Sequence, residues 1–141
     1  MKDRYPAEHS RAVTQLANRL IPNGHEMEVR VYYEDTDFSG VVYHSNYLKY
    51  MERSRTEWLR HLQIFHTDLE KDDSAFAIHR MALKYGPPAR IDDLLTVRTV
   101  LQKLTGARSF LRQEVLRREA DGEETMLCGA DVEVAFINHG E

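Results

Sequence analysis

Carboxylates and a histidine are grouped in residues 34–55, which read EDTDFSGVVYHSNYLKYMERSR. Asp37 and Gly40 lie in a stretch with turn composition, and a helical pattern of apolar residues follows from about Ser45. The first turn of a helix presents unpaired backbone N–H groups, which can act on a carbonyl beside a carboxylate. This spacing favours chemistry on a carbonyl group, with Asp37 beside the helix start.

Other roles and other chemistries were weighed against this interpretation. Asp37 could instead form a turn or cap the helix, and Asp35 is expected to be structural. The sequence has no dinucleotide fingerprint, phosphate loop or nucleophile elbow, and its histidines lack the spacing of a metal site. Cys128 shares the strand parity of core residues, which predicts buried packing rather than nucleophilic catalysis.

The helix that must position these groups has a wide apolar arc. Its members are Tyr47, Leu48, Tyr50, Met51, Ser54, Trp58, Leu59 and Leu62. Arg55 projects into that arc, so its guanidinium needs a partner, and Glu52 three residues earlier is the nearest carboxylate. A structural ion pair between the two is favoured over a catalytic role for Arg55.

Alternating apolar residues predict strands before and after this helix. The expected strands are residues 27–34, 76–85, 94–104, 109–118 and 125–137. Gly106 and the Asp121-Gly122 pair mark hairpin turns. One long helix inserted after the first of five antiparallel strands is an α+β arrangement.

The N-terminal segment is predicted to be an appendage, residues 1–25, ahead of a domain over residues 26–141. Ser10 could cap a short helix over residues 11–21 that Pro22 and Gly24 would end. We expect this helix to pack on the domain or on a neighbouring subunit. A role at a membrane surface is the weaker alternative, because its polar face is not strongly basic.

Bulk composition fits one globular domain of 141 residues. The net charge of −4 gives no reason to expect a nucleic-acid partner, and no apolar run approaches the ~20 residues of a membrane span. The chain has one cysteine, which cannot form an internal disulfide, so a cytoplasmic location is expected. The N-terminus lacks the apolar core of a secretory signal.

The segment from residue 29 to residue 55 resembles the hotdog-fold thioesterases of the 4-hydroxybenzoyl-CoA thioesterase family. The likeness is strongest to the bacterial Tol–Pal-associated acyl-CoA thioesterase branch. The matching stretches are VRVYYEDTD, Gly40, VVYH, NYLKYMERSR and Glu57, with weaker agreement in YGPPARIDDLLTV and ARSFLRQEV. The likeness covers roughly residues 27–137.

This resemblance implies a five-stranded sheet wrapped around one long helix, and two subunits that join their sheets, with dimers often forming tetramers. Active sites then lie at the subunit interface. Asp37 becomes the catalytic carboxylate, and the backbone N–H near His44 polarises the carbonyl. His44 itself could orient the substrate or Asp37, or contribute only its amide. The implied substrate-binding residues are Gly40, Val42, Tyr43, Tyr47, Arg108 and Ser109, of which the last two face the CoA phosphate arm.

The resemblance implies an acyl-CoA thioesterase that uses no cofactor and acts on short or aromatic acyl groups, with acyl-carrier protein as a possible alternative carrier. The leaving group of a thioester is a thiolate, whose conjugate thiol has a pKa of roughly 8.5, so the reaction needs a nucleophile or an activated water rather than a metal. The helix dipole favours an ionised Asp37, which makes direct attack preferable to general-base catalysis, although the base role stays open. The rival interpretations are a hydratase or dehydratase using His44, and a non-enzymatic acyl-carrier or membrane-machinery partner.

Overall fold

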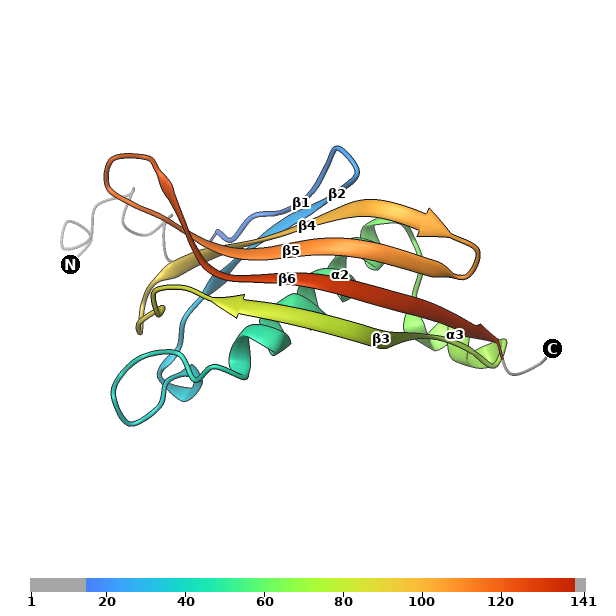
Figure 1. The fold of residues 1–141 in the computed structure, drawn as a ribbon, viewed down its shortest axis with the longest axis horizontal. Helices are drawn as coiled ribbons and strands as arrows, with labels where there is room; N and C mark the ends of the chain where they lie inside the picture. The colour runs from blue at the N-terminus through green and yellow to red at the C-terminus, as the bar shows by residue number, and fades with distance from the viewer. Residues whose placement is uncertain (1–14, 139–141) are drawn as a thin grey trace, which may run out of the picture.

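The computed structural model describes residues 15–138, which form one six-stranded antiparallel sheet and a long helix (Figure 1). The strand order is β1-β2-β4-β5-β6-β3. The strands are β1 Asn18–Ile21, β2 Gly24–Arg30, β3 Ser74–Tyr85, β4 Leu94–Thr105, β5 Arg108–Arg118 and β6 Glu124–Asn138. The helices are the 3-10 turn η2 Tyr33–Asp35, α2 Asn46–His61 and the short α3 His66–Lys71.

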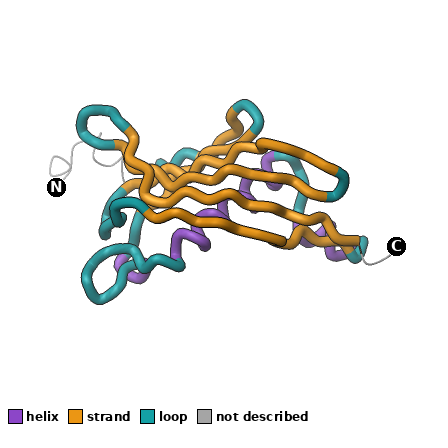
Figure 2. Tube along the Cα trace, in the orientation of Figure 1, coloured by secondary structure: helices purple, strands orange, loops and turns teal. Residues whose placement is uncertain are grey.

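Helix α2 lies across one face of the sheet, behind it in the view of Figure 2. Its first three turns bury Tyr47, Tyr50, Met51 and Ser54, which belong to the predicted apolar arc. Tyr47, Tyr50 and Met51 share one hydrophobic core with inward-facing residues of β2, β4, β5 and β6. The outer face of the sheet carries ion pairs such as Arg98–Glu124. The predicted α+β class is confirmed, with one strand more than expected.

The additional strand corrects the prediction for the N-terminal segment. A helix over residues 11–21 was expected, but residues 18–21 form β1 and pair with β2; residues 11–14 lie outside the described residues. The turn between the two strands explains the difference. Asn23 has a positive φ of 56°, and a side chain on Gly24 would meet the Thr99 carbonyl oxygen at 1.9 Å. Because Ile21 pairs with Gly24, the two central residues of the turn are Pro22 and Asn23. Proline followed by a residue that tolerates a positive φ is a turn signal, and it outweighed the helical spacing.

The strand predicted over residues 27–34 is also displaced. It runs over Gly24–Arg30, and the chain then enters η2, where Tyr33 is 81% exposed instead of buried. The Asp35 carboxylate causes this turn by accepting a hydrogen bond from the Tyr32 amide at 2.8 Å, while the Asp35 amide donates to the Tyr32 carbonyl at 3.0 Å. The hydrogen bonds between Asp35 and Tyr32 thus take the place of the strand pairing that the alternating apolar residues predicted.

The four later strands agree with the prediction to within two residues at each end. Cys128 on β6 is fully buried, as predicted, and burial raises the pKa of its thiol to about 11. A register shift between Val115 and Leu116 lets Leu127 turn into the core beside Cys128. Phe136, which the alternation placed inside, is 39% exposed at the far end of β6.

Arg55 has a different partner from the one predicted. Its Nη1 donates a 2.8 Å hydrogen bond to Oε1 of Gln113, a fully buried side chain on β5. Glu52 attracts the Arg55 guanidinium but makes no ion pair with it. Gln113 lies directly under the helix, so its uncharged amide reaches Arg55 where the exposed Glu52 does not.

Candidate functional site

The loop over residues 36–42 connects η2 to the start of α2 and carries Asp37. An isolated bridge pairs Thr36 with Val42, and the Asp37 amide donates to the Val41 carbonyl at 2.8 Å. Gly40 closes the turn, donating to the Asp37 carbonyl at 3.0 Å with a φ of 84° that glycine adopts easily. The loop is therefore a small hairpin whose conformation depends on its own backbone bonds.

The Asp37 carboxylate is exposed and is held by one neighbouring residue. Its Oδ1 accepts hydrogen bonds from the Ser39 hydroxyl at 2.6 Å and the Ser39 amide at 2.9 Å. These bonds lower the pKa of Asp37, with the hydroxyl as the largest cause and the amide next. The turn-forming role weighed for Asp37 is thus present, and it keeps the carboxylate ionised.

The start of α2 presents backbone donors. The Asn46 amide donates to the Tyr43 carbonyl at 2.8 Å, but within residues 15–138 the amides of His44 and Ser45 donate to no other residue. The His44 ring contacts the Tyr43 ring, with centroids 4.5 Å apart, and the Tyr85 hydroxyl donates to the His44 carbonyl at 3.2 Å. The unpaired amides are the kind of donor that stabilises an oxyanion.

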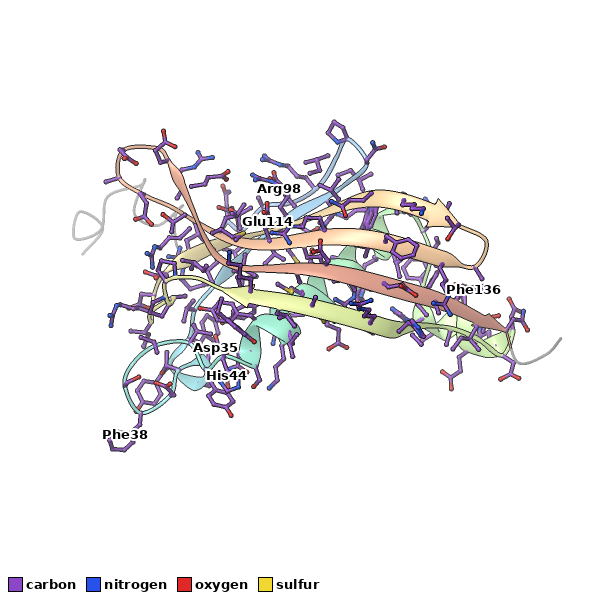
Figure 3. All side chains as sticks on the ribbon, viewed as in Figure 1. Asp35, Phe38, His44, Arg98, Glu114 and Phe136 are labelled. Atoms are coloured by element: carbon purple, nitrogen blue, oxygen red, sulfur yellow. The ribbon has the colours of Figure 1, made fainter. Side chains whose placement is uncertain are left out.

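Asp35 holds the loop against the helix, in keeping with its predicted structural role. Its carbonyl accepts hydrogen bonds from the Tyr43 amide at 3.0 Å and from Asn46 Nδ2 at 2.8 Å. Figure 3 shows Asp35 and His44 close together at the helix start, with Phe38 at the tip of the projecting loop. Phe38 is fully exposed, so an apolar ring adjoins Asp37 with no described residue covering it.

Two of the predicted substrate-binding residues are core residues in this chain. Val42 is 4% exposed and Tyr47 is 3% exposed. The Tyr47 hydroxyl accepts a 3.0 Å hydrogen bond from the Ala89 amide, and burial raises its pKa. Both residues therefore anchor the loop and the helix start to the segment that leads into β4. Tyr43 differs, because it is about half exposed beside His44.

Arg108 and Ser109 lie at the other end of the sheet from Asp37. The Asp37 loop bridges to Arg90, just before β4 begins, whereas Arg108 pairs with Thr105 where β4 ends. The 12 residues of β4 separate these positions, a length of roughly 36 Å at ~3 Å per residue. One chain thus does not bring Arg108 or Ser109 to Asp37.

Sequence reasoning missed several residues that shape these sites. Ser39 was read only as turn composition, although a serine two residues after an aspartate is a familiar partner for its carboxylate. Gln113 gave a signal, because it is a polar residue at a core position of an alternating strand. Tyr85 gave none, since its contact with His44 joins segments 41 residues apart.

The local chemistry suits attack on a carbonyl. An ionised carboxylate and unpaired amides occupy the two ends of one short loop. Residues 15–138 contain no group of three or more His, Cys, Asp or Glu side chains placed to hold a metal ion. Over the same residues, no helix has the length and apolarity needed to cross a membrane.

Comparison with known proteins gives consistent matches. The family model described as thioesterase superfamily matches residues 39–123. An acyl-CoA thioesterase of Haemophilus influenzae, YbgC, is 42% identical over 123 residues, which cover 86% of this chain and 87% of that protein. An acyl-CoA thioester hydrolase of Escherichia coli is 39% identical over 110 residues, 78% of this chain and 79% of that protein.

Solved structures extend the match to the fold. A probable thioesterase from Bartonella henselae is 42% identical with a TM-score of 0.74, covering 83% of this chain and 94% of that one. A 4-hydroxybenzoyl-CoA thioesterase variant bound to 4-hydroxybenzoyl-CoA has a TM-score of 0.75 at 18% identity, covering 81% and 84% of the two chains. At that identity the likeness concerns the fold alone.

Proposed function

The chain belongs to the thioesterase superfamily and has its hotdog fold, and we propose that it hydrolyses acyl-CoA thioesters of short-chain or aromatic acids to the free acid and CoA. The observation that carries the mechanism is the ionised Asp37 carboxylate on the same loop as the unpaired amides of His44 and Ser45. A thioester needs a nucleophile on one side and oxyanion donors on the other. This loop supplies both kinds of group.

Asp37 acts as the nucleophile in the proposed reaction. Its carboxylate oxygen bonds to the thioester carbon while the amides at the start of α2 stabilise the oxyanion. The C–S bond then breaks, CoA leaves as the thiolate and takes a proton from water, and water hydrolyses the mixed anhydride. The Ser39 hydrogen bonds support this role over general-base catalysis, because a carboxylate with a lowered pKa is a weak base.

We further propose that two copies form each complete site. Strand β3 is an outer strand with 12 residues whose second edge is unpaired among the described strands. Pairing this edge with the β3 edge of a second copy, antiparallel, would bring the Asp37 end of one chain towards the Arg108 end of the other. The separation of those residues within one chain supports this arrangement, and dimers could associate further into tetramers.

Two further proposals concern the carrier of the acyl group and the cellular location of the protein. Arg108 and Ser109 are proposed to face the CoA phosphate arm, and an acyl-carrier protein is the alternative carrier of the acyl group. The reducing cytoplasm is proposed as the location. The single cysteine of the chain supports this, since Cys128 is free and buried.

The test of the proposed function is thiol release from a panel of acyl-CoA and acyl-carrier thioesters. Asp37→Asn keeps the size and the acceptor for Ser39 but removes the nucleophilic charge, so we expect kcat/KM to fall at least about a hundredfold. Asp35→Asn is the matched control, because the amide oxygen can still accept from Tyr32, and it should keep activity of the wild-type order. Equal loss in both variants would rule out a special role for Asp37. A wild-type protein that releases no thiol from any thioester would favour a non-enzymatic carrier-binding role.

A further inference from the structure

Three short segments of the chain lie side by side at the Asp37 end of α2. The Asp37 amide donates to the Val41 carbonyl at 2.8 Å, and Val41 forms an isolated bridge with Arg90. Their neighbours Val42 and Ala89 are joined by a 2.8 Å backbone bond and are both buried. Side chains alternate between the two faces of such a ladder, and paired residues share a face. Asp37, Val41 and Arg90 therefore lie together on the face that points away from the core.

Arg90 is a free cation on this face. Its side chain is exposed and, within residues 15–138, makes no hydrogen bond or ion pair. Only its backbone is held, by an amide that donates to Asp93 Oδ2 at 2.9 Å. Arg117 of β5 shows the contrast, because it pairs with both Asp93 and Glu119. The guanidinium of Arg90 thus has no structural partner in this part of the chain, although it lies on the same face as the proposed nucleophile.

The spacing of the ladder sets the size of an acyl group that can reach from Asp37 to Arg90. Adjacent segments lie about 5 Å apart, so the two Cα atoms are separated by about 10 Å. A thioester carbon placed for attack lies about 3 Å from the Asp37 carboxylate, and the longer Arg90 side chain reaches to the same height. A carboxylate bound to the guanidinium occupies about 4 Å of the separation. About 6 Å remains, which is the extended length of a six-carbon acyl chain.

We propose that Arg90 selects acyl-CoA thioesters whose acyl group ends in a second carboxylate, such as the six-carbon adipyl group. Arg90 binds that carboxylate while Asp37 attacks the thioester carbon. This selection rests on the proposed function, and it names a substrate class within its short-chain acids. The guanidinium supports it, because its fork of N–H donors matches the two oxygens of a carboxylate.

The order of the three segments also supports this direction for the acyl group. The segment with Arg90 continues into β4 of the same chain, and the segment with Asp37 is the outermost of the three. The CoA arm is proposed to leave Asp37 towards Arg108 of a second copy, across the free edge of β3. The acyl group then extends the other way, over Val41 towards Arg90.

Thiol release tests this selection, with the methyl ester of adipyl-CoA as a neutral substrate of nearly the same size. In the wild type, kcat/KM should be about tenfold higher for adipyl-CoA than for the ester, chiefly through a lower KM. Arg90→Gln should bring this ratio close to one. Arg90→Lys keeps the charge without the fork and should keep part of the ratio. Arg60→Gln removes another exposed arginine, which pairs with Glu57 on α2, and should keep the wild-type ratio.

A shorter acyl chain provides a test that needs no variant. Malonyl-CoA also ends in a carboxylate, but its three carbons are too few to span from Asp37 to Arg90. Its kcat/KM should therefore show no advantage over that of its own methyl ester. This comparison keeps the selection falsifiable if Arg90→Gln does not fold, because an equal advantage for malonyl-CoA and adipyl-CoA would contradict it.

Several other results would overturn the role of Arg90. Equal kcat/KM for adipyl-CoA and its methyl ester in the wild type would do so, as would a ratio that persists in folded Arg90→Gln. An equal fall for both substrates in Arg90→Gln would mean that Arg90 meets the CoA phosphates instead. These results leave the proposed function intact, because the neutral ester is still hydrolysed. A wild-type protein that releases no thiol from any acyl-CoA would refute the proposed function and this selection with it.

Discussion

Asp37 and His44 are exposed beside the first turn of α2, whereas the second half of the helix borders a groove of about 760 Å³ that none of residues 36–45 lines. Around the first turn, Asp37 and its neighbours bond mainly to their own loop. In the second half, Arg55 depends on Gln113, 58 residues away in sequence. Within one chain, the Asp37 loop and the apolar groove therefore lie at opposite ends of one helix. The two-copy site proposed above would bring the two ends together.

The largest effect is expected from blocking the free edge of β3. Consecutive N–H groups on a strand alternate in direction, so one of Met81→Pro and Ala82→Pro removes a donor from the free edge and the other from the ladder with β6. We expect the edge variant to be a folded monomer without thioesterase activity, measured by light scattering, circular dichroism and thiol release. The ladder variant should instead lose stability. Wild-type mass and activity in both variants would show that each end of α2 functions within one chain.

Removing the polar support under the second half of α2 should cost stability. Gln113→Leu leaves the Met51 carbonyl, Thr99 and Arg55 without their partner, so the free energy of unfolding should fall by about 2–4 kcal/mol. Urea unfolding would measure it. Glu114→Gln changes the next residue of β5, whose surface pair with Arg112 is worth little, and should stay within about 0.5 kcal/mol. Similar losses in the two variants would mean that the buried network does not stabilise the helix.

The two ends of α2 also differ in how far the sequence could predict them. Asp37, Gly40 and the helix start lie within a few residues of one another, so turn composition and periodicity were sufficient to locate them. The Arg55–Gln113 bond joins two elements, and no local pattern specifies which carboxylate or amide reaches a buried guanidinium. The same limit applies to residues 18–21, where pairing with β2 decided between strand and helix. The roles of Arg108 and Ser109 stay predictions, because one chain does not bring these residues to Asp37.

Acid should weaken the packing of β1 and β2 against α2. His25 is fully buried, its Nε2 lies 2.6 Å from Asn18 Oδ1, and its pKa is lowered by burial and by His61, against the attraction of Glu57 and Glu26. A histidine with a lowered pKa stabilises the fold above its ordinary pKa of 6.5, and this contribution is lost as the pH falls through the lowered value. The slope should not exceed about 1.4 kcal/mol per pH unit. Thermal unfolding between pH 7.5 and 5 would measure it, and His25→Gln should flatten the dependence. An equal slope in the variant would assign it to other groups.

The smallest effect is expected on the acidic side of the pH profile of kcat/KM, and it concerns the loop beside the first turn of α2. Ser39→Ala removes the hydroxyl that does most to lower the pKa of Asp37, so that pKa should rise. Activity needs the ionised carboxylate, and the fall of kcat/KM on the acid side should therefore begin at a higher pH, with little change at neutral pH. Ser45→Ala is the matched control, because the Ser45 side chain makes no capping bond at the start of α2, and its profile should match the wild type. An acid limb that does not move in Ser39→Ala would mean that the titrating group is not Asp37, which would leave the first turn of α2 with its amides but without its nucleophile.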